Sequence, residues 1–435
     1  MLDIKFIRQN TELVKQMIKN RGVDVDIDRT IELDKRHREV LHKRETIKAE
    51  QNKASKNIPK NTEEIENLKT LKERVKILEQ EERTLFAELN EHLLHIPNIT
   101  SSDTPAGHDE SKNVIVREVG EKPKFDFTPK EYLNIAEALD IIDIETASVV
   151  SGSRFGYLKR SAALLEFALV QLTLNHLTDE GFVKKLIKKN DLNISTRPFI
   201  PIVPPVLIRP EMIYAMGFTE RAGIPKGTDE VYFLDKDNLY LAGTSEQSMG
   251  PMHYGMVADE KDLPMRYIGF STCFRRESGS YGKDTKGILR VHQFDKLEMF
   301  TVSTPEKSNN EHKLILAVEE ELMQELKIPY RVVRLCTGDL GAASASTYDI
   351  ETWFSGQGVY RETHSTSNTT DYQARSLNAK YSTGQDIHIV HMLNGTAFAI
   401  GRMIIAIIEN YQTKNGTISV PKALRKYMHN VKEIK

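Results

Sequence analysis

The sequence predicts an α+β protein in which a largely antiparallel sheet, flanked by helices, follows an antiparallel coiled-coil hairpin. Residues 28–95 hold almost no glycine or aromatic residue and repeat apolar residues at heptad spacing, whereas helix-like and strand-like stretches alternate after residue 129. Strands in a run, closed by a few helices, are typical of an α+β body. A loop-like stretch separates the two regions, and we place the domain boundary in it, giving domains 1–105 and 106–435.

The hairpin is predicted from two apolar runs and the break between them. The first run repeats every seven residues, with Arg44 among its polar seam residues, at Leu33, Val40, Ile47 and Ala54. The second run uses spacings of three and four, interrupted by Glu82, at Leu68, Leu71, Val75, Leu78, Leu85 and Leu89. Such spacing is the seam of a coiled coil. Between the runs, Pro59 cannot continue a helix, and Thr62 looks like the start of the second one.

The two helices of the hairpin differ in charge. Residues 35–60 contain nine Lys and Arg against three Glu, and residues 62–91 contain nine Glu against five Lys and Arg. One interpretation is a solvated hairpin whose helices attract each other. The other is a projecting arm whose basic edge contacts a phosphate backbone, and the arm by itself does not distinguish the two.

Within the body, the hydrophobic pattern predicts separate helices and strands. Helices are expected at Ala162–Thr178, Glu306–Leu326 and Ile400–Gln412. Strands are expected at 113–120, Tyr240–Leu241, Met265–Phe270, Lys296–Val302, Tyr330–Leu335 and Asp386–Met392.

Composition excludes several classes of protein. The net charge of −2 provides no global attraction to nucleic acid, so any such contact needs a local patch. Only two cysteines occur, Cys273 and Cys336, and their separation argues against both a disulfide framework and a structural zinc site. The sequence shows no signal peptide, no transit peptide and no run of about 18 apolar residues, so we expect a cytoplasmic protein without a membrane segment.

The segment 273–300 carries the most chemical information. Its two expected strands would present Arg275, Glu277 and Phe294 to one ligand, because alternate side chains of a strand share a face. An arginine suits a phosphate, and a phenylalanine ring can stack on a purine. The polar loop between the strands is rich in glycine, at Gly279, Gly282 and Gly287. Taken alone, the segment is also compatible with a charged surface hairpin.

Three further segments carry candidate polar groups. Thr244 and Glu246 follow a strand-like stretch and would alternate onto one face, where a hydroxyl and a carboxylate can hold an ammonium group. Glu362 and Ser365 offer oxygen ligands of the kind that Mg²⁺ prefers. The segment 394–402 would open the last apolar helix, with small residues packed beneath a ligand and a permanent cation at its end. Each segment alone is compatible with an ordinary core or surface element.

Together, and in this order, these segments resemble the seryl-tRNA synthetases of class II across nearly the whole chain. Pro205 matches the proline of the first class II motif. Besides the helical arm, the resemblance rests on SGSRF (151–155), FIPIVPPVLIRPE (199–211), TSE (244–246), FRRE to HQFDKLE (274–298), TGD (337–339), YDIETW (348–353), REx₂S (361–365), DYQAR (371–375) and LNGTAFAIGR (393–402).

The resemblance implies a fold, an activity and partners. The fold is the class II antiparallel sheet flanked by helices, which dimerises through the first motif around Pro205. The activity is that of a serine–tRNA ligase, which forms seryl-adenylate from L-serine and ATP. The seryl group then passes to the 3′ end of tRNA(Ser), with tRNA(Sec) left open as a second acceptor. The metal that accompanies ATP is Mg²⁺.

Residue roles follow from the matching positions. Serine would be bound by Thr244, Glu246, Arg275, Glu298, Asn394 and Thr396. ATP would be bound by Arg275, Glu277, Arg290, Val291, Phe294, Glu362, Thr363, His364, Ser365 and Arg402. The catalytic residues would be Arg275 and Arg402, and the metal ligands Glu362 and Ser365. The tRNA would be contacted by Lys35, Arg36, Arg38, Lys43, Arg44, Lys48 and Lys53.

Two rival interpretations come from other classes. One is a catalytically inactive coiled-coil protein that binds RNA or acts as a scaffold, and the retained site residues argue against it. The other is a serine-activating ligase that loads a non-tRNA acceptor, and the retained arm argues against it. The chain also departs from the family pattern. His364 and Thr366 flank Ser365 where a serine and a cysteine are usual, and residues 183–198 look like an insertion.

Overall fold

The computed structural model describes residues 1–56, 61–218, 230–278 and 286–435, so Pro59, Gly279 and Gly282 lie outside the described residues. The described chain forms two compact units, and the first ends at Pro97. Residues 98–105, which we placed with the arm, hydrogen-bond within the second unit. The amides of Asn98 and Ser101 donate to the carbonyls of Ala342 and Ala345 at 2.7 and 2.8 Å. Along the described chain, every helix is too short or too polar to cross a membrane.

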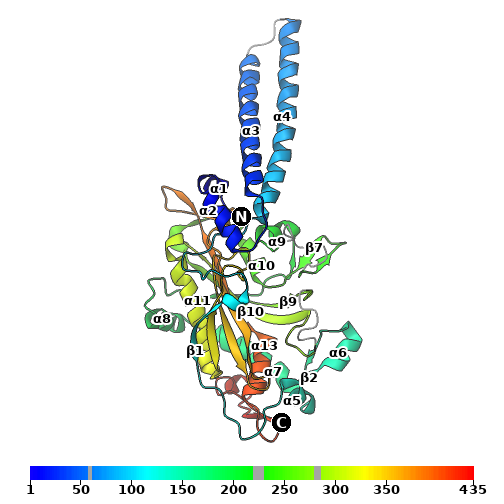
Figure 1. The fold of residues 1–435 in the computed structure, drawn as a ribbon, viewed down its shortest axis with the longest axis vertical. Coiled ribbons are helices and arrows are strands. Elements are labelled where there is room, and N and C mark those ends of the chain that lie inside the picture. The colour runs from blue at the N-terminus through cyan, green and yellow to red at the C-terminus, as the bar shows by residue number, and fades with distance from the viewer. Residues whose placement is uncertain (57–60, 219–229, 279–285) are drawn as a thin grey trace. The chain divides into compact units, whose positions relative to one another are not determined.

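In the described part of the first unit the regular structure is helical, and it confirms the predicted hairpin. Its helices are α1 (Ile4–Gln9), α2 (Thr11–Asn20), α3 (Ile27–Ala54) and α4 (Thr62–His95). Figure 1 shows α3 and α4 as two long helices lying side by side. Asn61 caps α4 by accepting a hydrogen bond from the amide of Glu64 at 2.8 Å, so the helix begins at Thr62 as expected.

The seam between α3 and α4 follows the heptad pattern. Its buried apolar residues are Leu33, Val40, Ile47, Leu71, Val75, Leu85 and Leu89. Arg44 and Glu82, which interrupt the two apolar runs, form an ion pair with each other, and their side chains are only 25% and 18% exposed. A polar pair inside a seam favours one register of the two helices over others. These two residues therefore explain how a seam with charged interruptions stays aligned.

The second unit is built on an eight-stranded sheet, antiparallel except where β4 pairs with β9. This confirms the predicted fold class. In spatial order the strands are β1 (Val114–Val119), β11 (Tyr330–Arg334), β12 (Ser346–Phe354), β13 (Val359–Asn368), β16 (His391–Ala399), β10 (Gln293–Ser303), β9 (Met265–Phe274) and β4 (Ile200–Ile202). Short strands complete the unit, namely β2 (Ile142–Asp143), β3 (Tyr157–Leu158), β5 (Leu207–Ile208), β6 (Phe233–Leu234), β7 (Leu239–Leu241), β8 (Val257–Asp259), β14 (Lys380–Ser382), β15 (Ile387–Ile389), β17 (Ile418–Ser419) and β18 (Glu433–Ile434).

Three long helices share one hydrophobic core with the sheet: α7 (Arg160–Leu177), α11 (Pro305–Leu326) and α13 (Ile400–Asn410). They lie within two residues of the predicted helix ends. Leu297 and Met299 of β10 point into this core, whereas Lys296 and Glu298 alternate to the opposite face of the strand. That opposite face carries the candidate site. The shorter helices are α5 (Tyr132–Ala138), α6 (Ile144–Ser151), α8 (Glu180–Lys189), α9 (Pro210–Ala215), α10 (Glu246–Met249) and α12 (Tyr372–Leu377).

Three local expectations were wrong. Residues 394–399 belong to strand β16 and do not open a helix, which begins only at Ile400. The strand expected at 386–392 is two strands, β15 and the start of β16, separated at Val390. The long strands β12 and β13 were not expected, because buried Thr, Ser and His side chains conceal their apolar alternation. Tertiary packing, which the pattern does not contain, decides these segments.

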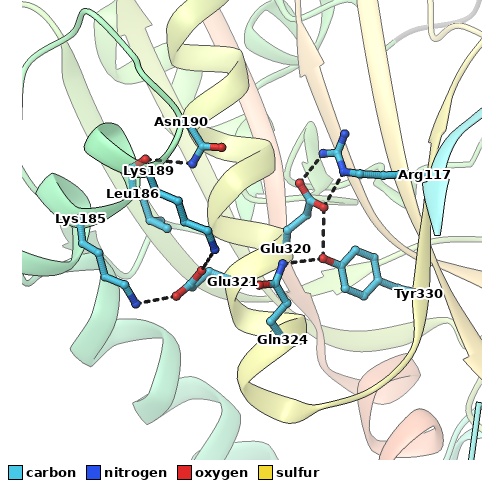
Figure 2. Close-up of polar contacts among 9 residues, drawn as sticks. All are labelled: Arg117, Lys185, Leu186, Lys189, Asn190, Glu320, Glu321, Gln324 and Tyr330. Atoms are coloured by element: carbon cyan, nitrogen blue, oxygen red, sulfur yellow. Dashed lines mark hydrogen bonds and ion pairs between the residues drawn. The ribbon is translucent and has the colours of Figure 1, made fainter. Parts of the chain in front are cut away.

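The suspected insertion at 183–198 contains most of helix α8. Its apolar residues Phe182, Val183, Leu186 and Ile187 are buried in the main core. On its polar side, Lys185 and Lys189 both contact the Glu321 carboxylate of α11, at 2.8 and 2.7 Å. Figure 2 shows the two lysines converging on Glu321, while the neighbouring Glu320 accepts from Arg117 of β1 and from Tyr330. The segment is therefore a packed part of the fold.

Candidate active site

The hairpin of β9 and β10 forms one wall of the site. Cys273 pairs with Phe294, so Arg275, directly after β9, lies beside the start of β10. The Arg275 guanidinium lies 5.3 Å from the centre of the Phe294 ring and donates from Nε to the carbonyl of Gly243 at 3.0 Å. Arg290 reaches Glu277 at 3.4 Å. The hairpin thus gathers an arginine, a carboxylate and an aromatic face, as predicted.

Gly287 anchors the returning strand of this hairpin. Its φ is +84°, and a Cβ built there would lie 1.7 Å from the hydroxyl oxygen of Tyr132. The same hydroxyl accepts a hydrogen bond from the amide of Ile288 at 2.7 Å. Only glycine allows the chain to pass this tyrosine in that conformation.

Eight of the ten residues expected to bind ATP line one cleft, whereas His364 and Ser365 do not. The cleft contains Arg275, Glu277, Arg290, Val291, Phe294, Glu362, Thr363 and Arg402, together with Lys296 and Thr396 from the floor. Arg402, in the first turn of α13, donates from Nη1 to the carbonyl of Glu362 at 2.8 Å and lies 3.2 Å from its carboxylate. Four separated segments therefore supply three arginines, two carboxylates and a ring to a single cavity.

A β-bulge aligns Glu362 with Ser365. Residues three apart on a regular strand face opposite ways, but the pairing of β13 with β12 skips Thr363. Thr363 and His364 both turn inward, are 1% and 0% exposed, and join through a 2.8 Å hydrogen bond. Their side chains therefore lie away from the cleft, and any contact with a nucleotide would use their backbone. Burial lowers the pKa of His364 to about 3, so its ring is neutral.

Asp349 is a candidate metal-site residue that the sequence analysis missed. It pairs with Ser365 in the sheet register, and its carboxylate accepts a hydrogen bond from that serine. Burial and then the neighbouring Glu362 raise its pKa well above the usual range, and its Oδ1 atom is buried without a hydrogen bond. Asp349, Glu362 and Ser365 thus lie on one face of the sheet, and two carboxylates with a hydroxyl are suitable oxygen donors for a hard divalent cation. The motif YDIETW (348–353) contains this aspartate, and its carboxylate could have been considered as a metal ligand from the sequence.

The floor of the cleft is a network around Glu298. Thr396 donates to Glu298 Oε2 at 3.2 Å, and Lys296 Nζ lies 2.6 Å from the same oxygen. Lys296 also donates to the hydroxyl of Thr244 at 3.0 Å. Lys296 was not among the expected site residues, although Phe294, Lys296 and Glu298 alternate along β10 and the spacing alone would have placed it there.

Glu246 forms the second buried carboxylate of the floor. It does not alternate with Thr244 along a strand as expected, since β7 ends at Leu241 and Glu246 opens helix α10. Its Oε1 atom accepts from Asn394 at 3.2 Å and from Gln373 at 3.0 Å. Burial, and then the charge of Glu298, raise its pKa to about 7. Gln373, within DYQAR, is another residue that the sequence analysis missed.

The arm divides the expected tRNA-contact cations into two groups. Arg38, Arg44 and Lys48 form ion pairs within the hairpin, with Asp34, Glu82 and Glu79. In the described part of the arm, no carboxylate pairs with the others, which are Lys35, Arg36, Lys43 and Lys53. At about 100° per residue these four lie within an arc of about 100° on α3. These four cations share that side of the helix with Glu39 and Glu50, and we call the four cations the α3 stripe.

Comparisons with known proteins agree with this geometry. Residues 1–100 match the model of the seryl-tRNA synthetase N-terminal domain, and residues 232–411 match that of the tRNA synthetase class II core domain (G, H, P, S and T). The serine–tRNA ligase of Dictyoglomus turgidum is 42% identical over 439 residues, covering 98% of each chain. That of Nitrosopumilus maritimus is 37% identical over 444 residues, covering 100% of each.

Solved structures give the same result. Seryl-tRNA synthetase from Pyrococcus horikoshii, complexed with ATP, has a TM-score of 0.86 at 37% identity and covers 100% of this chain and 99% of its own. Cytoplasmic serine–tRNA ligase from Naegleria fowleri, in complex with AMP, has a TM-score of 0.83 at 33% identity over the same shares. The chain therefore belongs to the seryl-tRNA synthetases, a family of ATP-dependent class II aminoacyl-tRNA ligases.

Proposed function

We propose that this chain activates L-serine with ATP and transfers the seryl group to the 3′ end of tRNA(Ser). One observation carries the proposal: the candidate groups for the nucleotide and for the amino acid meet in one cleft of the sheet, joined through Lys296 and Thr396. The terminal phosphates face Arg402, the adenine stacks on Phe294, and the serine lies over Glu298 and Glu246.

The chain's residues act chiefly by positioning and by neutralising charge. The serine carboxylate attacks the α-phosphorus in line, and pyrophosphate leaves. Arg275, held by its contacts with Gly243 and Phe294, would contact both the carboxylate and the α-phosphate, and a fixed cation there stabilises charge without reorganisation. Mg²⁺ would be held by Glu362 and Ser365, with Asp349 beside them, and supplies additional charge neutralisation on the phosphates.

Serine is selected by its two polar groups. Its hydroxyl bonds to Glu298 and Thr396, and its ammonium group is held by Glu246 and Thr244. Alanine would leave the buried Glu298 carboxylate without its partner, a loss that discriminates strongly against it. Threonine has the hydroxyl, so its rejection depends on steric fit.

The arm binds the tRNA backbone through the α3 stripe. Cations that hold no carboxylate are free to replace counterions on phosphates, whereas Arg38, Arg44 and Lys48 also serve the hairpin itself.

The chain acts as a cytoplasmic homodimer joined around Pro205. Exposed apolar side chains within the first motif support this, with Val203 83% and Ile200 55% exposed. β4, which contains Ile200, is an edge strand of the large sheet. Analytical sedimentation of Val203→Glu tests the interface. The variant should sediment as a monomer, and one that still sediments as a dimer would exclude this interface.

Amino-acid-dependent ATP–pyrophosphate exchange tests the activity. Serine should stimulate exchange, alanine and threonine should barely do so, and Arg275→Ala should abolish it. Arg83→Ala, an exposed arginine of α4, is the matched control and should exchange normally. Exchange without tRNA charging would favour a ligase for another acceptor, and absence of exchange would favour an inactive scaffold.

A further inference from the structure

Lys296 is a buried cation to which the scheme above assigns no contact with a substrate. Its residue is 7% exposed, and its ammonium group lies 2.6 Å from Glu298 Oε2 and 3.0 Å from the Thr244 hydroxyl oxygen. Two residues expected to hold serine, from separate segments of the chain, are thus tied together by one side chain. Taking an ammonium group out of water is costly, so its position needs a reason beyond packing.

We propose that Lys296 is a specificity-determining positioning residue, which holds the Glu298 carboxylate charged and oriented to accept the serine hydroxyl. The inference rests on the proposed function and deepens it.

The contacts of the Glu298 carboxylate are divided between its oxygens. Lys296 and Thr396 both contact Oε2. Within the described part of the chain, no protein donor contacts Oε1. The two contacts on Oε2 fix the plane of the carboxylate, and Oε1 is left as the acceptor for a substrate hydroxyl. A carboxylate with one oxygen held in place and the other open can discriminate between substrates with and without a correctly placed hydroxyl.

The surrounding charges require a cation at this position. Glu298 is fully buried, and the other charged groups that interact with it are Glu246 on α10, Glu319 on α11 and Arg275 after β9. Burial raises the pKa of Glu298, and Lys296 is the largest influence that lowers it. Removing Lys296 would therefore raise the pKa of Glu298 further. A protonated Glu298 would donate to the substrate hydroxyl where the proposed role requires it to accept.

The first experiment is serine-dependent exchange by Lys296→Met between pH 6.5 and 9. At pH 7 we expect KM for serine to rise by about tenfold or more, with KM for ATP changed by less than about twofold. The preference for serine over alanine should fall. The defect should shrink as pH rises, because Glu298 then ionises without help. Lys313→Met, an exposed lysine of α11, is the matched control and should behave as wild type.

A double-mutant cycle provides the second experiment. The uncharged side chain of Glu298→Gln needs no cation, so adding Lys296→Met to it should change KM for serine little further. If the two residues acted independently, the fold-changes of the two single variants would multiply in the double variant. Lys296→Gln keeps a hydrogen-bond donor without the charge and serves if Lys296→Met does not fold, as judged by thermal unfolding and by KM for ATP. A loss of serine activation that is independent of pH, or multiplicative effects in the cycle, would overturn the proposal. Exchange by the wild type tests the proposed function separately. If the wild type activates serine and Lys296→Met does so equally well, only the role of Lys296 is rejected.

Discussion

Glu246, which we propose holds the serine ammonium group, is expected to make substrate binding depend on pH. Its pKa is raised to about 7 by burial and then by Glu298, so a large share of the free protein carries a protonated Glu246 below neutrality. A serine ammonium group binds the ionised form, and binding must therefore displace that proton. Affinity for serine falls as pH falls through 7, and it is fully present above it.

The corresponding prediction concerns KM for serine between pH 8 and pH 5.5. Below about pH 7 it should rise by up to about tenfold per pH unit, while KM for ATP stays nearly constant. Glu246→Gln should have a high KM for serine that no longer changes with pH in this range. Steady-state exchange kinetics measure both, and a flat wild-type profile would contradict the assignment of Glu246.

Glu319 is a buried carboxylic acid that should make the stability of the folded protein depend on pH. Both of its carboxylate oxygens are buried without a hydrogen bond, beneath Gly395 of β16. Burial, followed by the charge of Glu298, raises its pKa well above the usual range. A carboxyl group whose pKa is higher in the folded than in the unfolded protein holds its proton on folding, so stability decreases as pH rises.

Replacing Glu319 by glutamine removes this dependence. Glu319→Gln should match wild-type stability at pH 5 and exceed it increasingly toward pH 9, by about 1–3 kcal/mol at the upper end. Urea unfolding at several pH values measures the difference. An equal difference at every pH would show that the carboxylate is not protonated in the folded protein.

At the scale of elements, helix α8 is held by its apolar face more than by its lysines. Lys185 and Lys189 are 61% and 50% exposed, and they oppose the effect of partial burial strongly enough to lower the pKa of Glu321. Exposed ion pairs contribute little to stability. Leu186, by contrast, is fully buried in the main core.

We therefore expect Leu186→Ala to reduce the free energy of unfolding by about 2–4 kcal/mol. Replacing both Lys185 and Lys189 by alanine should cost only about 1 kcal/mol or less, and the loss should shrink at high salt. Thermal unfolding of both variants at two salt concentrations tests the ranking. The reverse ranking would mean that the contacts drawn in Figure 2 hold the helix in place.

The α3 stripe and the seam of the arm predict different defects. Lys43→Glu should weaken tRNA binding and reduce the slope of log affinity against log salt by about one, without altering exchange or melting. Arg44→Glu should instead destabilise the hairpin, because Glu82 would then face a like charge, and Arg44→Glu with Glu82→Arg should restore it. Filter binding and circular dichroism separate the two defects. Lys76→Glu, on α4, is the control for charge alone.

At the scale of the whole molecule, the chain divides into two compact units, and we expect activation to need only the second and transfer to need both. All residues assigned to serine and ATP lie in the second unit, and the α3 stripe lies in the first. Deleting residues 35–90 should leave serine-dependent exchange nearly intact, while tRNA charging collapses. Charging that survives the deletion would show that the arm is not needed for tRNA.

Much of this protein is determined by its sequence alone. Heptad spacing defines the hairpin, because two helices pack along a seam that repeats every seven residues. The apolar stretches of α7, α11 and α13 define the helices that bury one face of the sheet. The order of the motifs identifies the family before any residue is placed in space. Hydrogen-bonding and charged residue types at those positions also indicate the chemistry.

Other features depend on contacts between distant segments, which no local pattern contains. The bulge at Thr363 brings Glu362 and Ser365 to one face, although their spacing on a regular strand would oppose them. The same fold turns His364 and Thr366 inward, away from those two residues. Lys296 and Gln373 become parts of the site only because β10, α10 and α12 meet there. Only the tertiary structure decides these roles, since a side chain's charge state and partners are set by the segments packed around it.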